Sequence, residues 1–174
     1  MKTLLLSLLL SVCIFAQSLT LKEGFVAAHT EMLITSIDPL NTFLKADVSI
    51  DQNDILSLRG KFWIQMDKFS SDNKERDEDM HKANRITAFP LATFTLIKLS
   101  KNTDGTYTIE GNLEFLGLIK PLQAKAEIHD KDGLVSIKAT TKIFADDFGL
   151  EMPCILFVCV DEEIDLYVKA VFLK

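Results

Sequence analysis

Apolar and polar residues alternate with a period of two along most of the chain. Such alternation is typical of antiparallel strands that turn one face toward a dry core and the other toward water. The pattern is clearest in five segments, at 56–66, 106–115, 122–129, 135–143 and 164–173. Weaker strands of the same kind are predicted at about 19–28, 43–51 and 92–100, which makes about eight strands in all.

Turn-forming sequences separate the strand segments. The tetrapeptides NTDG at 102–105 and DKDG at 130–133 suit hairpins between neighbouring strands. Because a single open sheet of about eight strands would leave exposed edges, we expect the sheet to close into a barrel or to fold into a sandwich. A barrel of about eight strands has an interior that side chains can fill or that can hold one small ligand.

One segment, 70–86, interrupts the alternation and is predicted to form a helix. Ser70 or Ser71 can cap its start, acidic residues occupy its first turns, and Pro90 follows its end. A smaller turn or helix is expected at 144–150. The predicted fold is therefore all-β with one short helix inserted between strands.

The predicted inward face mixes large aliphatic residues with small ones. Either the small residues leave space for a ligand, or they relieve crowding where strands curve strongly. The small residues are Gly60, Gly111, Ala124, Ala126, Ala139 and Ala170. If the lumen is hollow, we expect the ligand to contact Leu58, Phe62, Ile64, Met66, Ile109, Phe115, Ala126, Ile137, Ala139, Leu166 and Val168.

The length and charge of the chain narrow the choice of function. Its 174 residues suffice for one domain. The 25 acidic residues exceed the 19 lysines and arginines, which gives a net charge of -6 and a pI near 5.1. An acidic chain lacks the basic surface that binding to a phosphate backbone requires, so we expect no nucleic-acid partner.

The first residues predict export. An apolar run at 4–15 follows a short positive start, and its length is well below the roughly 20 residues that span a bilayer. Residues 1–16 are therefore predicted to be a signal peptide, followed by one exported domain at 17–174. Lipid attachment at Cys13 is the alternative form of processing.

Two cysteines, Cys154 and Cys159, remain in the predicted exported domain. In an extended strand they would stand about 16 Å apart, beyond the reach of a disulfide. They could bridge if the intervening segment folds back as a loop, which an oxidising compartment would permit. Alternatively, both are small buried apolar residues.

Residues with catalytic or metal-binding chemistry are scattered. His29, His81 and His129 lie far apart without the spacing of a metal site, and the sequence contains no phosphate loop and no nucleophile motif. Arg76 and Asp77 are better explained as a structural pair that anchors the helix. We therefore expect no catalytic residues, no metal and no cofactor.

Three motifs follow one another in an order that resembles the YceI-like family, whose members are exported lipocalin-like proteins that bind polyisoprenoid and other long-chain lipids. The first, within 69–94, consists of Arg76, Asp77, His81, Phe89, Pro90, Thr93 and Phe94. The second, within 111–122, consists of Gly111, Leu113, Gly117, Lys120 and Pro121. The third consists of Asp147, Phe148, Gly149, Glu163 and Ile164.

This resemblance implies an antiparallel eight-stranded lipocalin-like barrel. It also implies a periplasmic, non-catalytic carrier or storage protein, with a long-chain lipid or isoprenoid as ligand rather than as cofactor. By the same resemblance, His29 and His81 would make polar contacts near the barrel mouth. Transient contact with a membrane surface and a homodimer are both compatible with it.

The apolar segment 153–160 has three interpretations. It could be part of the core, a lid that presents Ile155, Leu156, Phe157 and Val158 to a lipid tail or membrane, or a contact between subunits. The alternative function follows if this segment is a contact surface. In that case the barrel is filled and the segment 153–160 docks a protein partner. An enzyme acting on an isoprenoid head group would need a nucleophile or an acid–base pair that the motifs do not provide.

Overall fold

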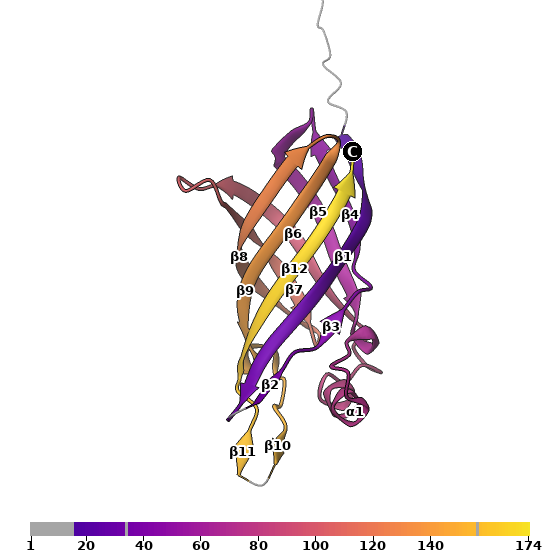
Figure 1. Ribbon diagram of the computed structural model, residues 1–174, viewed down its shortest axis with the longest axis vertical. Helices are drawn as coiled ribbons and strands as arrows, with labels where there is room; N and C mark the ends of the chain where they lie inside the picture. The colour runs from indigo at the N-terminus through magenta and orange to yellow at the C-terminus, as the bar shows by residue number, and fades with distance from the viewer. Residues whose placement is uncertain (1–15, 34, 156) are drawn as a thin grey trace, which may run out of the picture.

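Eight antiparallel strands form a closed barrel in the computed structural model, which describes residues 16–33, 35–155 and 157–174 (Figure 1). Each strand pairs with its neighbour in sequence, and the last pairs with the first to close the barrel. The predicted all-β fold with eight strands is thereby confirmed. The strands are β1 (Ala16–Met32), β4 (Lys45–Asp51), β5 (Asp54–Gln65), β6 (Leu91–Lys101), β7 (Tyr107–Phe115), β8 (Leu118–Lys131), β9 (Leu134–Phe144) and β12 (Glu163–Leu173).

The two ends of the barrel differ. The end drawn at the top of Figure 1, here called the upper end, carries the C-terminus and the β8–β9 hairpin. The opposite, lower end carries the long connections and the elements labelled β2, α1, β10 and β11. The additional elements of the chain are β2 (Thr35–Ile37), β3 (Leu40–Asn41), η1 (Met66–Lys68), α1 (Lys74–Ala83), η2 (Ala145–Phe148), β10 (Cys154–Ile155) and β11 (Val158–Cys159).

Three hairpins of the barrel use two-residue turns in which both central residues have positive φ. This conformation matches the right-handed twist of the flanking strands, and glycine or asparagine adopts it at low cost. The predicted turn at 130–133 is one of the three. The central residues are Gln52 and Asn53, Leu116 and Gly117, and Asp132 and Gly133.

Helix α1 is shorter at both ends than the sequence predicts. It begins at Lys74, because Asn73 is the N-cap and its side-chain oxygen accepts the Arg76 N–H at 3.0 Å. Ser70 and Ser71 are therefore not the caps. Among the described residues, no helix is long and apolar enough to cross a membrane.

The two serines instead fasten α1 through Asp77. Both hydroxyls donate to the Asp77 carboxylate at 2.7 Å, as does the Ser71 N–H. Burial alone would raise the pKa of Asp77, but these hydrogen bonds outweigh it and hold the pKa below its ordinary value. The helix is thus anchored by Asp77 and the serines rather than by a bond between Arg76 and Asp77.

Two of the inward glycines sit where neighbouring strands approach closely. A Cβ at Gly111 would overlap the Phe94 ring and the Thr95 carbonyl. Gly60 has a φ of 136°, and a Cβ there would meet the Asp47 carbonyl. At these positions glycine relieves crowding and creates no free space.

The predicted signal peptide, residues 1–16, lies outside the described residues except for Ala16, with which β1 begins. Cys13 also lies outside them. Export, cleavage and the domain limits at 17–174 therefore stay predictions.

Candidate functional site

The upper end of the barrel is a packed core. Its inward side chains come from strands that the short hairpins hold in register. Most of them are buried, while Leu21 and Tyr107 are partly exposed. Lys174 closes this end. Its side-chain ammonium lies 2.6 Å from the Asp130 carboxylate, and its backbone N–H donates to the Gly133 carbonyl at 3.0 Å. Exposure is 0–2% at Ile50, Val48, Leu58, Val135 and Phe172.

The interior toward the lower end is different. Eight apolar side chains point inward there, on the same face of their strands as the packed core, yet each is only half-buried. These side chains pack against the buried core but do not exclude water fully, which indicates an incompletely filled interior at this level. We call this space the lower chamber, lined by Ala28, Ala46, Phe62, Phe94, Leu122, Ala124, Leu166 and Val168. Ala28 and Leu166 also border a cavity of about 520 Å³ at the barrel wall.

Those residues predicted to line the lumen that lie on barrel strands face inward. They differ in burial, since some border the lower chamber and others are fully packed. Phe62, Leu166 and Val168 border the lower chamber. The others are buried. Leu58, Ile109, Ala126, Ile137 and Ala139 belong to the upper and middle parts of the core, whereas Ile64, Met66 and Phe115 are buried at the lower ends of β5 and β7. Sequence reasoning missed Ala28, Ala46, Phe94, Leu122 and Ala124 as chamber residues, although the alternation at 122–129 already placed Leu122 and Ala124 on the inward face.

His29 lies on the outer wall of the barrel, one residue beyond the inward Ala28. Its Nδ1 lies 2.5 Å from the carboxylate of Asp38, which also accepts the Ser36 hydroxyl at 2.5 Å. The hydrogen bond to Asp38 raises the pKa of His29. The same two contacts, with Ser36 first, lower the pKa of Asp38. His29 therefore pins the β2–β3 connection to β1 and does not face the lumen.

His81 lies on α1 and is half-buried. Its Nε2 is 3.2 Å from the Phe69 carbonyl oxygen, so the neutral ring can donate through that nitrogen. This contact fastens α1 to the segment after η1. Among the described residues, no group of three or more His, Cys, Asp and Glu side chains is arranged to hold a metal ion.

Two cavities lie on the outer wall. One, of about 520 Å³, lies where β1, β12 and β9 run side by side, and its charged groups already pair with one another. Lys142, for example, binds both Glu163 and Asp165, which raises its pKa. The other, of about 700 Å³, is polar and lies beside the β6–β7 turn. There the Thr106 hydroxyl and N–H, followed by Lys125, lower the pKa of Asp104 to about 2.

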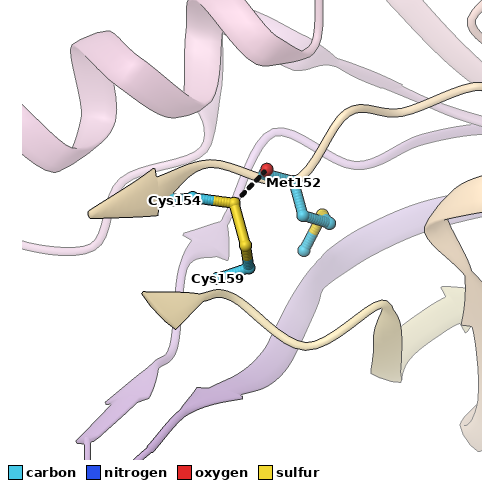
Figure 2. Close-up of a disulfide and its surroundings, with 3 residues drawn as sticks. All are labelled: Met152, Cys154 and Cys159. Atoms are coloured by element: carbon cyan, nitrogen blue, oxygen red, sulfur yellow. Dashed lines mark hydrogen bonds between the residues drawn. A yellow bond between two sulfur atoms is a disulfide. The ribbon is translucent and has the colours of Figure 1, made fainter. Parts of the chain in front are cut away.

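The segment 153–160 folds back as the hairpin β10–β11, with Cys154 opposite Cys159. The two form a disulfide beside Met152 (Figure 2). Both cysteines are exposed, so their interpretation as buried apolar residues is wrong. Phe157 is 100% exposed while Val160 is 4% exposed, and the core interpretation therefore fails at the tip of the hairpin.

Comparison with known proteins agrees with this architecture. Residues 19–172 match the family model of the YceI-like domain. A UPF0312 protein of Vibrio vulnificus is 34% identical over 89 residues, which are 50% of this chain and 47% of that protein. The chain thus spans about half the length of the curated relatives it matches.

Solved structures share the fold at low sequence identity. BcnA of Burkholderia cenocepacia has a TM-score of 0.75 at 14% identity, over 85% of this chain and 95% of that one. A polyisoprenoid binding domain from Saccharophagus degradans has a TM-score of 0.69 at 9% identity, over 89% and 97%. The YceI protein of Campylobacter jejuni has a TM-score of 0.70 at 18% identity, over 81% and 86%. Because the family match covers the barrel almost from end to end, the chain belongs to the YceI-like domain family.

Proposed function

We propose that this protein binds one long apolar chain in the lower chamber and performs no chemistry on it. The observation that carries the proposal is the ring of inward apolar side chains that stay half-buried inside a closed barrel. Leaving these side chains in contact with water costs free energy, and an apolar ligand that displaces the water recovers it.

The energetics favour a long chain over a short one. Each buried methylene contributes about 0.8 kcal/mol, so ten contribute roughly 8 kcal/mol. Association itself costs an estimated 4–15 kcal/mol, which a short acyl fragment would not offset. The ligand class is therefore an isoprenoid, a quinone-like molecule or an acyl lipid. The Saccharophagus degradans relative in fold, described as a polyisoprenoid binding domain, supports the first of these.

The same proposal places the protein in the periplasm. Two observations support export: the apolar run at 4–15 and the exposed Cys154–Cys159 disulfide. Disulfides persist in oxidising compartments and are rare in the cytosol.

Native mass spectrometry tests the proposal. Protein purified from its own host is measured first, and delipidated protein is then offered palmitate and a long-chain polyisoprenol. We expect a stoichiometric adduct.

A bulky side chain that fills the chamber, Ala28→Trp, should abolish this adduct, because Ala28 faces the chamber. The adjacent Ala27→Trp is the matched control, since strand alternation turns Ala27 to the opposite face from Ala28, which packs against the core. Equal uptake by both variants, or no adduct with either lipid, would reject the proposal.

A second candidate function rests on the β10–β11 hairpin. Its fully exposed Phe157, held by the Cys154–Cys159 disulfide, suits a contact with a protein partner. Phe157→Asp should release a partner that co-elutes with the wild-type protein in size-exclusion chromatography. An unchanged elution profile would leave this hairpin without a docking role.

A further inference from the structure

The barrel wall has a discontinuity between β8 and β9. The described pairings between these strands run from Lys131 opposite Leu134 to Lys125 opposite Thr140, and go no further. Both strands continue toward the lower end, β8 paired with β7 and β9 paired with β12. The last tie is the Thr141 hydroxyl, which donates to the Gln123 carbonyl at 2.6 Å. We call the stretch below this tie, 118–123 on β8 and 142–144 on β9, the seam.

The sequence of β8 agrees with an edge at the seam. Pro121 lies within this stretch, opposite Asn112 of β7. A proline has no N–H for the ladder and is found on edge strands rather than central ones. The two-residue turn at Leu116 and Gly117 keeps β8 on β7, so β8 diverges from β9 as each follows its other neighbour.

Apolar side chains lead from the outside of the seam to the chamber. On the outer rim, Ile119 of β8 is 63% exposed and Phe144 of β9 is 48% exposed. Just inside, Leu122 and Ala124 of β8 line the lower chamber. An exposed apolar rim that continues into an apolar interior costs free energy in water, and an apolar chain lying in the seam would cover it.

The short helix η2 follows β9 directly and spans the seam at its lower end. Its Phe148 is 3% exposed and packs on Phe115 of β7, with ring centroids 5.4 Å apart. Its Asp147 carboxylate lies 3.9 Å from the ammonium of Lys120 on β8. Both charged side chains are about half exposed, and such an ion pair is weak in water. The start of η2 is fixed, because Ala145 is fully buried and its N–H donates to the Glu162 carbonyl at 2.8 Å. Toward β7 and β8, η2 is held by the buried Phe148 ring and by the weak Asp147–Lys120 ion pair.

We propose that the seam is the port through which the apolar chain passes sideways into the lower chamber, with η2 as its gate. This inference rests on the proposed function, because it requires a ligand in the chamber. A lateral port lets a long chain slide in along its length, whereas an opening at the barrel end requires the chain to thread in by its tip.

A disulfide across the seam tests the port. The hydrogen bond from the Thr141 hydroxyl to the Gln123 carbonyl keeps β8 and β9 close at the upper edge of the seam. Gln123 and the adjacent Lys142 are exposed on the outward face of their strands there. The pair Gln123→Cys and Lys142→Cys is made with Cys154→Ser and Cys159→Ser, so that reduction acts on the new bond alone. The matched control is Glu127→Cys with Lys138→Cys, which are register partners in the part of β8–β9 that is already paired.

Loading of delipidated protein is followed by the rise in fluorescence of cis-parinaric acid. We expect oxidation to slow loading of the seam variant at least about tenfold and reduction to restore it, since gated access limits the rate. The control should load equally in both states. Equal loading of the oxidised and reduced seam variant would overturn the port and leave the chamber intact. If no variant takes up the probe in either state, the proposed function fails first.

The gate is tested separately at its latch. Asp147→Asn removes the ion pair with Lys120, whereas Asp146→Asn is an equally conservative change one residue earlier in η2. We expect faster loading of Asp147→Asn at unchanged final occupancy, and no change for Asp146→Asn. Identical loading rates for the two variants would show that η2 is not the gate.

Discussion

The two ends of the barrel are built from the same alternating strands but do different work. At the upper end, inward side chains such as Ile50 and Phe172 exclude water completely. Toward the lower end, some side chains on the same face, such as Phe62 and Leu166, are only partly buried, although Ile64 and Phe115 beyond them are buried. The difference teaches that alternation fixes which way a side chain points, whereas the connections at each end decide how tightly it is packed.

The connections explain the asymmetry. Short turns join β4 to β5, β6 to β7 and β8 to β9 at the upper end, so these strands arrive together and their side chains meet. At the lower end, the connections 66–90 and 145–162 are long and contain α1, η2 and the β10–β11 hairpin. At this end β8 is held on β7 by the two-residue turn at Leu116 and Gly117, whereas β9 leads into the long connection 145–162, and the two strands separate at the seam. We expect the upper end to supply most of the stability and the lower end to supply function.

The largest effect should come from the edge-to-face pair of Phe172 and Phe62, whose ring centroids are 6.1 Å apart. Phe172→Ala should lower the free energy of unfolding by about 3–5 kcal/mol, because it empties a packed site. Phe62→Ala should cost about 1–2 kcal/mol, since the ring is already partly hydrated. Urea denaturation of the delipidated variants measures both. Equal losses would contradict the division between a packed end and a hollow end.

A smaller effect is expected when inward alanines are enlarged. Ala170 is 1% exposed, so Ala170→Leu should overpack the core and cost about 1–3 kcal/mol. Ala124 borders the chamber, and Ala124→Leu should cost less than about 0.5 kcal/mol while weakening ligand binding. Thermal unfolding measures the loss of stability in the two variants, and ligand titration measures their affinity. A large loss of stability in Ala124→Leu would mean that the chamber is filled at this position.

The smallest effect concerns pH at the lower end. The hydrogen bond to Asp38 raises the pKa of His29 above its ordinary value of 6.5. The contact therefore contributes fully below pH 6.5 and is lost as the pH rises through the raised pKa. An NMR titration should show His29 titrating above 6.5, with chemical-shift changes confined to the β2–β3 connection.

In Asp38→Asn, the titration of His29 should move back toward lower pH, because the carboxylate that stabilises the imidazolium is gone. Shift changes of similar size at Val135 or Phe172 would show that the upper end shares this pH dependence. If His29 titrates at or below pH 6.5 in the unmodified protein, its contact with Asp38 does not stabilise the imidazolium.

The strands, the turns and the family of this protein could be predicted from the sequence, because each depends on residues close together in the chain. The alternation located all eight barrel strands and assigned the inward face of the five clearest ones, and Asp132 with Gly133 marked the β8–β9 turn. The motifs from Arg76 to Ile164 indicated the YceI-like family, which the match over 19–172 confirms. The sequence predicted the helix but placed its start too early, because the N-cap is Asn73 and not Ser70 or Ser71.

Features that depend on distant parts of the chain were decided only by the tertiary structure. Leu58 and Phe62 share one strand face, yet Leu58 is buried in the core and Phe62 borders the chamber, because depth depends on which side chains the other strands bring opposite. The Cys154–Cys159 bond required the intervening segment to fold back. The seam required β8 and β9 to follow different partners. Sequence period determines the face of a residue by local geometry, whereas packing depth and openings in the wall arise from how eight strands meet in space.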